Sequence, residues 1–537
     1  MQLFDLPDDV LRMVLRKSRT GATSRGSLIK RNLPLLAVCR RWRALALPVV
    51  FGNMSVKYVE DWRHVCPSLD NAQTRHGRVE TDMAPIAPAG YAQMVRRLEI
   101  SVCSFADSIV GLEAVLDAMA ETADTWRGVR QLCVSVRQGV HRPCAAGTGP
   151  ADYRDAVRRV CSRLAAMLPG VRRLVCEGEH RDAIVEMLYG RIAGCYAGRL
   201  QRLHSSSPAT APRDALFTRL VDLRIGRYSG ADPRQLLRVC PDALERLSLP
   251  DLESSHAWAS FCADGGAQVI RFPNLRTLDV SYRFECVAGG GREQRQGAPA
   301  WQLHFPKLRT MSVDCPWGTC PLLRDAVLPS HMDAVTLKLT SSALCSIGST
   351  AMPAARCLKL VVQRGSYGGP AAMVAANRLL ESAQGSGEVE LSTLESLDCV
   401  LPDVITCASL TRLWVAAPTG VDAMLGLVRG LPNLAYLGLQ HLEAEDVQSD
   451  IPVPAPDDQR PVEPLSTSIR SMYVNTYGDR ATQGAIVQAI RHVLLGLPAL
   501  RALSARNLPS KPIAEFVCAY SARFPRLASV RLDICER

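Results

Sequence analysis

Aromatic residues are scarce in this sequence, and the short motifs of common catalytic sites are missing from it. Phe, Trp and Tyr make up 5% of its 537 residues, so Leu, Val and Ala must do most of the packing. It contains no phosphate-binding G-x-x-x-x-G-K-[ST], no hydrolase-type G-x-S-x-G and no zinc-binding H-E-x-x-H. We therefore expect neither enzymatic activity nor a cofactor, and the ten scattered histidines do not change this expectation.

The nineteen cysteines include no C-x-x-C pair, and the nearest approach to a cluster is Cys315 with Cys320. Zinc sites need paired thiolates at tighter spacing, so no metal site is expected. Several cysteines lie in or beside strand-like segments and are interpreted as small buried hydrophobes: Cys133, Cys176, Cys357 and Cys399. Unpaired cysteines without an apolar export signal predict a reducing compartment, the cytoplasm or the nucleus. No apolar run approaches the length of a membrane span.

The positive charge is concentrated at one end. The formal net charge is +11, and residues 1–50 hold ten Arg or Lys against three Asp. Such a segment is either a docking face for an acidic protein or nucleic acid, or a solvated helix surface. Nucleic-acid binding has no recognised motif to support it, so it ranks behind protein binding.

A short phrase recurs along most of the chain: an apolar residue, two variable residues, and an apolar residue that opens a strand. Examples are Leu244-Glu245-Arg246-Leu247, Leu275-Arg276-Thr277-Leu278, Leu434-Ala435-Tyr436-Leu437 and Leu500-Arg501-Ala502-Leu503. About sixteen such phrases occur, on average about 29 residues apart, which is within the range of leucine-rich repeats. A unit of this size cannot bury its own apolar face, so it must stack on copies of itself in a solenoid.

Helical segments are predicted between many of these phrases. Apolar residues recur at helical spacing in residues 107–125, 152–168, 180–193, 484–497 and 512–522. Several phrases follow an apolar-Pro pair, as at Leu168-Pro169, Phe272-Pro273, Phe305-Pro306, Leu431-Pro432, Leu497-Pro498 and Phe524-Pro525. Because Pro ends a helix, the predicted unit is a helix, a Pro turn and a strand. The predicted fold class is α/β, a horseshoe-shaped leucine-rich-repeat solenoid whose parallel sheet lines the concave side.

Two helices are predicted before the repeats. Residues 5–17 carry Pro7 at the start, where Pro is tolerated, and an apolar stripe that includes Val10 and Leu11. A second helix is expected from about Leu33 to Leu47, ended by Pro48. Two helices this short cannot form a core alone, so they need a neighbour, either the solenoid or another protein.

These N-terminal residues resemble an F-box. The resemblance lies in Leu6-Pro7-Asp8-Asp9-Val10-Leu11, the pair Leu35-Leu36, and Val38-Cys39-Arg40-Arg41-Trp42-Arg43, and Leu47-Pro48-Val49-Val50-Phe51 is similar to the segment that follows the F-box in many fungal proteins. It covers about a tenth of the chain and is followed by leucine-rich repeats. The loop 18–32 is longer than the usual F-box connection.

The resemblance implies a substrate-recognition adaptor of an SCF-type ubiquitin ligase. Such a protein binds a Skp-type adaptor, and through it a cullin and a RING protein, while its repeats hold a substrate protein. Matched to the F-box pattern, the expected adaptor-docking residues are Leu6, Pro7, Val10, Leu11, Leu36, Val38, Cys39 and Trp42. Trp42 has a second interpretation as a residue that closes the helical module against Leu11 and Leu15. The alternative function is a leucine-rich-repeat binding scaffold unconnected with ubiquitin, in which residues 1–50 cap the solenoid.

The expected domain organisation has three parts. Residues 1–55 form the F-box-like module, residues 56–93 a linker or capping region, and residues 94–537 the irregular solenoid. Polar, Gly-rich or Pro-rich insertions interrupt the solenoid at 283–300, 363–371 and 443–468. Each insertion is either a recognition element or a tolerated surface loop.

Overall fold

A computed structural model of the chain describes residues 7–9, 11, 13, 40–60, 77–81, 90–104, 108–138, 150–178, 183–206, 216–226, 238–239, 241–252, 269–282, 302–315, 320, 322–323, 326–340, 354–363, 388–393, 411–443, 463–476, 480–508, 510–524 and 526–533. The chain divides into two compact units. Unit 1 comprises Met1–Pro250 and His256–Gly266, and unit 2 comprises Asp251–Ser255 and Ala267–Arg537. The predicted insertions fall almost entirely outside the described residues.

The sheet of unit 1 is parallel apart from one strand at its edge. Its strands are β1 (Asn53–Glu60), β2 (Gly77–Thr81), β3 (Arg97–Ser104), β4 (Gln131–Gln138), β5 (Arg173–Glu177), β6 (Arg202–Ser205), β8 (Asp222–Ile225) and β10 (Arg246–Leu252). They pair in the order β2–β1–β3–β4–β5–β6–β8–β10, and only β2 runs antiparallel to its neighbour. A separate parallel pair is formed by β7 (Leu216–Phe217) and β9 (Arg238–Val239).

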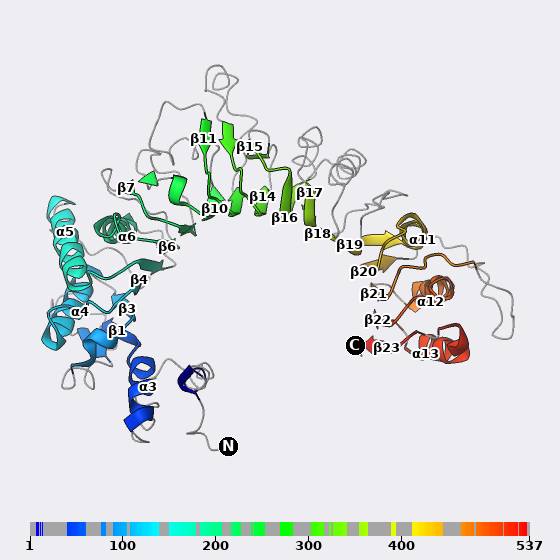
Figure 1. The fold of residues 1–537 in the computed structure, drawn as a ribbon, viewed down its shortest axis with the longest axis horizontal. Coiled ribbons are helices and arrows are strands. Elements are labelled where there is room, and N and C mark those ends of the chain that lie inside the picture. Colours follow the sequence, from blue (N-terminus) through cyan, green and yellow to red (C-terminus); the bar gives the residue numbers. More distant parts are fainter. Residues whose placement is uncertain are drawn as a thin grey trace, which may run out of the picture. The chain divides into compact units, whose positions relative to one another are not determined.

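The helices of unit 1 lie together on one face of its sheet (Figure 1). They are α4 (Ser108–Thr122), α5 (Pro150–Met167) and α6 (Ala183–Cys195). α4 packs against α5 and the strands β1 and β3, and α5 packs against α6. The helix α3 (Arg40–Val50) precedes β1, and 3-10 turns occur at η4 (Tyr91–Met94) and η6 (Pro241–Ala243).

Unit 2 has the same two layers. Its main sheet is fully parallel and contains β12 (Thr277–Tyr282), β14 (Thr310–Cys315), β16 (His331–Thr340), β17 (Ala354–Gln363), β18 (Glu388–Thr393), β19 (Arg412–Gly420), β20 (Tyr436–Glu443), β21 (Ser471–Thr476), β22 (Ala502–Arg506) and β23 (Ser529–Asp533). The helices α11 (Val421–Gly430), α12 (Arg480–Leu495) and α13 (Ser510–Ala519) follow one another on the same side of β19–β23, and η8 (Ser521–Arg523) follows α13 (Figure 1).

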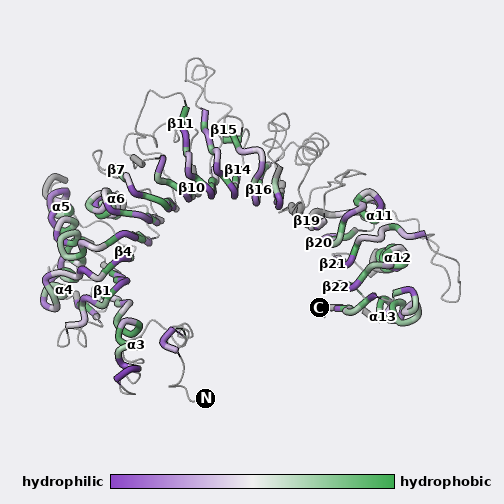
Figure 2. Tube along the Cα trace, in the orientation of Figure 1, coloured by the Kyte–Doolittle hydropathy of each residue, from purple (hydrophilic) through white to green (hydrophobic). Residues whose placement is uncertain are grey.

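The second apolar residue of each phrase forms a continuous column inside the sheet. In unit 1 the strand register aligns Leu98, Leu132, Leu174, Leu203, Leu223 and Leu247, and all six are at most 1% exposed. Successive strand side chains point to opposite faces, so the intervening polar residues face outward. Figure 2 shows that the strands carry both hydrophobic and hydrophilic residues. Burial of each leucine contributes roughly 1.5–3 kcal/mol, which makes this column the main core of unit 1.

Main-chain hydrogen bonds join each strand to the next in a repeated way. The carbonyl of the residue just before a strand accepts hydrogen bonds from two consecutive N–H groups. These belong to the residue just before the next strand of the sheet and to the first residue of that strand. Gly52 accepts from Arg96 and Arg97 at 2.8 and 2.9 Å, and Arg96 accepts in turn from Arg130 and Gln131 at 2.8 and 3.0 Å. Unit 2 repeats the arrangement at Arg470, which accepts from Arg501 and Ala502.

The five helices predicted between the phrases are confirmed as α4, α5, α6, α12 and α13. Two of the expected Pro turns differ, because Phe272-Pro273 and Phe305-Pro306 follow short strands rather than helices. These strands, β11 (Val269–Arg271) and β13 (Gln302–His304), pair in parallel, as do β13 and β15 (Ala326–Val327). The rings of Phe272 and Phe305, which directly follow β11 and β13, stack with their centroids 5.3 Å apart.

Two further differences concern the start of the chain. The sheet begins at Asn53, upstream of the expected start of the solenoid at residue 94, because β1 already pairs with β3 over seven residues. The prediction that Pro48 ends the second helix is wrong, since α3 continues through Pro48 to Val50. Pro48 lies in the last turn, where few later residues depend on the helix being regular.

Candidate functional site

Three of the eight expected adaptor-docking residues lie in the described part of the chain. Pro7 is exposed, whereas Leu11 and Trp42 are 1% and 5% exposed. The other five, Leu6, Val10, Leu36, Val38 and Cys39, lie outside the described residues. The burial of Trp42 agrees with its packing role, in which the indole closes the helical module.

The segment around Pro7 is helical and is attached to α3. The N–H of Leu11 donates to the carbonyl of Pro7 at 3.0 Å, which closes one helical turn. Arg41, at the start of α3, donates from Nε and Nη2 to Oδ1 of Asp8 at 3.0 and 2.7 Å. Both side chains are about half exposed, so this pair contributes at most about 1 kcal/mol. It nevertheless brings together the two elements of the F-box-like pattern.

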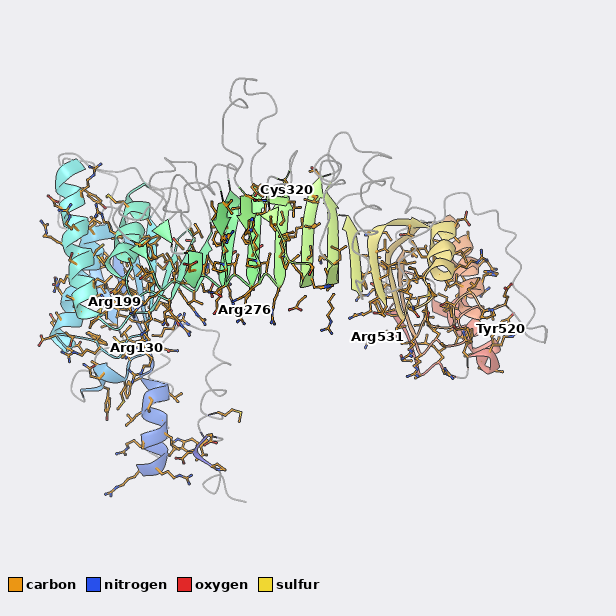
Figure 3. All side chains as sticks on the ribbon, turned by 45° about the horizontal axis from the view of Figure 1, so that its top comes forward. Arg130, Arg199, Arg276, Cys320, Tyr520 and Arg531 are labelled. Carbon is orange, nitrogen blue, oxygen red and sulfur yellow. The ribbon has the colours of Figure 1, made fainter. Side chains whose placement is uncertain are left out.

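α3 continues directly into the sheet but is not covered by the helical layer. Leu45, Ala46 and Val50 are buried, and Phe51 packs its ring against Tyr91 at 4.8 Å. The next residue, Gly52, provides the carbonyl that starts the main-chain connection to β3. Figures 1 and 3 both show α3 extending past the β1 end of the sheet, with the turn around Asp8 beside it. This arrangement presents α3 at the end of unit 1.

Unit 2 carries an aromatic cluster on the outward face of its sheet. The cluster consists of Trp414 on β19, Tyr436 on β20 and Tyr473 on β21, and all three are partly exposed. The Trp414 ring is stacked with Tyr473 at 4.9 Å between centroids and with Tyr436 at 6.3 Å. Arg412 places its guanidinium 5.2 Å from the centre of the Tyr436 ring. Partial burial raises the pKa of the Tyr436 hydroxyl, and Arg412 opposes that shift.

Gly438 makes room for this cluster. In the register it lies between Trp414 and Tyr473, and a Cβ at this position would overlap Cε3 of Trp414. Sequence reasoning missed the cluster. Its signal is that Trp414, Tyr436 and Tyr473 occupy outward positions of three neighbouring phrases, in a chain where aromatic residues are few.

Three buried thiols, Cys161, Cys176 and Cys320, have raised pKa values. Burial raises the pKa of Cys161 to about 12, and it raises the pKa of Cys176 further. A hydrogen bond with Cys315, together with burial, raises the pKa of Cys320 well above its usual value. These thiols stay protonated near neutral pH and are poor nucleophiles. Partial burial lowers the pKa of His441. Cys399 lies outside the described residues.

Within the described ranges, no group of three or more His, Cys, Asp or Glu side chains is arranged to hold a metal ion. No helix among the described residues combines the length and the apolar character that crossing a bilayer requires.

The sequence was also compared with other proteins. No model of a protein family matches the chain, and no curated protein matches it. The F-box resemblance therefore rests on the residues of the chain itself.

Proposed function

We propose that this protein is a substrate-recognition adaptor of an SCF-type ubiquitin ligase, acting in the cytoplasm or nucleus. Its N-terminal helices bind a Skp-type adaptor, and a leucine-rich-repeat solenoid, the horseshoe that the sequence predicts, holds the substrate protein. The chain itself forms no covalent intermediate. It acts by proximity, because a substrate held beside the ubiquitin-charged enzyme reacts at a high effective concentration.

The observation that carries the proposal is the position of α3. Residues of the F-box-like pattern come together across 33 positions through Asp8 and Arg41. The helix then extends past the first strand instead of joining the helical layer (Figure 1). A helix pair at the end of unit 1 is accessible to a partner. Because Gly52 connects α3 directly to the sheet, a partner bound to α3 would be held in a fixed orientation relative to that sheet.

The aromatic cluster supports the substrate-binding half of the proposal. Trp, Tyr and Arg are the residue types most enriched at energetic hot spots of protein interfaces. Trp414, Tyr436, Tyr473 and Arg412 present all three types on one outward face of unit 2. Because these rings already pack against each other, they would lose little side-chain entropy when a partner binds.

One observation favours the alternative function of a scaffold unconnected with ubiquitin. Leu11 and Trp42 are buried within the chain itself, as expected if α3 only caps the repeats. In that case the N-terminal helices bind no adaptor, while the outward sheet faces keep their binding role.

Co-purification distinguishes the two functions. We expect the full-length chain to capture a Skp-type adaptor with its cullin and RING partners, and Leu6→Ala with Pro7→Ala to abolish that capture. Val110→Ala, which truncates an exposed apolar side chain on α4, is the matched control and should capture normally. Circular dichroism confirms that each variant is folded. Undiminished capture by the Leu6/Pro7 variant would refute the adaptor assignment and leave the scaffold.

A further inference from the structure

Four arginines occupy one outward row of the unit 1 sheet. Arg97, Arg173, Arg202 and Arg246 are each the first residue of their strand, and all four are exposed. The register places them in one line across the sheet, in the order Arg97, Gln131, Arg173, Arg202, Asp222, Arg246. We call these four residues the arginine row.

Two members of this row, Arg173 and Arg202, have no counter-ion among the described residues. Arg173 and Arg202 are direct neighbours on strands about 4.8 Å apart, where like charges destabilise a sheet. Neither forms an ion pair with any described residue. The acid within the row, Asp222, is 8% exposed and its Oδ1 accepts from Nε of Arg224 at 3.4 Å. The row therefore carries a repulsion that an anionic ligand would relieve.

Neighbouring arginines show what a structural role looks like in this unit. Arg96 donates from Nη1 to the carbonyl of Gly128 at 3.0 Å, and Arg130 donates to the carbonyl of Gly170 at 3.3 Å. Each arginine thus joins the segment before its own strand to the turn before the next strand of the sheet. Arg130 is labelled in Figure 3. Arg173 and Arg202 make no comparable contact among the described residues, so the fold does not explain their presence.

The shape of the basic strip indicates the kind of ligand. The next outward row contains Glu99 as well as Arg224, and the one after it contains Glu177, so carboxylates interrupt the positive charge beyond the arginine row. A broad polyanion such as duplex nucleic acid would meet these carboxylates. The described outward positions of β3, β4, β5, β6, β8 and β10 include no Phe, Trp or Tyr, the rings on which single-stranded nucleic acid chiefly stacks.

We propose that the arginine row binds an acidic protein segment in extended conformation, which crosses the strands with its carboxylates on the guanidinium groups. Planar guanidinium groups suit carboxylates because they donate two parallel hydrogen bonds. This inference goes beyond the adaptor role and holds for a scaffold as well, since it concerns only the face of unit 1.

The test uses the full-length chain and a fluorescein-labelled peptide of alternating Ser and Glu, followed by fluorescence anisotropy. We expect binding that weakens as salt rises, and a loss of about tenfold or more in Arg173→Gln with Arg202→Gln, because two charge-assisted contacts disappear. Arg154→Gln with Arg159→Gln removes the same charge from exposed positions on α5 and should bind nearly as the wild type does.

Folding and adaptor binding are separated by two further measurements. Arg173→Gln with Arg202→Gln should melt at or above the wild-type temperature, because a repulsive pair is removed. Leu6→Ala with Pro7→Ala should bind the peptide normally, so failure of the adaptor assignment leaves this inference standing. Equal losses in both arginine variants, no binding even at low salt, or tighter binding of oligouridylate than of the peptide would each overturn it.

Discussion

Gly438 shows how a missing side chain shapes a surface at the scale of a single residue. Its strand lies between those of Trp414 and Tyr473, and the space above its Cα is filled by the Trp414 ring. Any other residue would compete with that ring for the same volume. The aromatic cluster thus depends on one glycine as well as on its own three rings.

Gly438→Ala should displace Trp414 and weaken its stacking with Tyr473. We expect a loss of about 1–3 kcal/mol in the free energy of unfolding, together with altered near-ultraviolet circular dichroism. Gly484→Ala is the matched control, because its Cβ would meet nothing within 4 Å and alanine favours the helix α12. An unchanged near-ultraviolet spectrum in Gly438→Ala would contradict the role given to this glycine.

At the scale of elements, a single hydroxyl joins two strands and a helix. The Oη of Tyr189, on α6, accepts from the N–H of Val136 at 3.0 Å and donates to the carbonyl of Glu177 at 2.8 Å. Val136 belongs to β4 and Glu177 ends β5, so the tyrosine fastens α6 to both strands. Burial raises the pKa of Tyr189, which keeps its hydroxyl protonated and able to donate.

Tyr189→Phe should lower the free energy of unfolding by about 1–3 kcal/mol, because the buried N–H of Val136 and the partly buried carbonyl of Glu177 both lose their partner. Tyr196→Phe provides the comparison, since its hydroxyl makes a single longer bond of 3.3 Å to the carbonyl of Leu164. Urea denaturation measures both variants. A larger loss for Tyr196→Phe than for Tyr189→Phe would contradict this account.

Elements were predictable from sequence where one pattern determines one structure. Apolar residues at helical spacing marked α4, α5 and α12, and the phrases marked strands such as β10, β12, β20 and β22, each of which opens at the third residue of its phrase. A mixed α/β fold with a large parallel sheet is confirmed, while the horseshoe and the F-box stay predictions. An apolar-Pro pair marks only where an element ends and not its type, so the expected unit of helix, Pro turn and strand does not hold at β11 and β13.

The candidate sites were harder to predict because they depend on register. Trp414 and Tyr473 are 59 positions apart in the chain, and no local sequence pattern indicates that their strands lie on either side of the strand that carries Gly438. The arginine row is scattered in sequence for the same reason. Of the expected docking residues, Trp42 illustrates a different limit: an aromatic at helical spacing can serve packing or docking, and here it is buried.

At the scale of the whole molecule, stability should be local. Each central strand of the unit 1 sheet pairs only with its two neighbours, so we expect damage in one place to spread only a short distance. The leucine column of unit 1 makes this testable, because Leu132 is fully buried between Leu98 and Leu174.

Leu132→Ala should cost about 2–5 kcal/mol and increase amide exchange in β3, β4 and β5. Exchange in β20, β21 and β22 should stay unchanged. Ser135→Ala, at an outward position of the same strand, is the control and should have little effect. Hydrogen–deuterium exchange with mass spectrometry reports all three regions at once, and uniform acceleration across the chain would contradict local stability.

The paired main-chain bonds between neighbouring strands have a consequence for how such a molecule diversifies. One carbonyl, such as that of Gly52 or Arg470, accepts both N–H groups that open the next strand, so the joint is made without any side chain. Substitutions on the outward face leave these joints intact. Single substitutions on the outward face can therefore change which partner is bound, while the main-chain hydrogen bonds that hold the strands together stay the same.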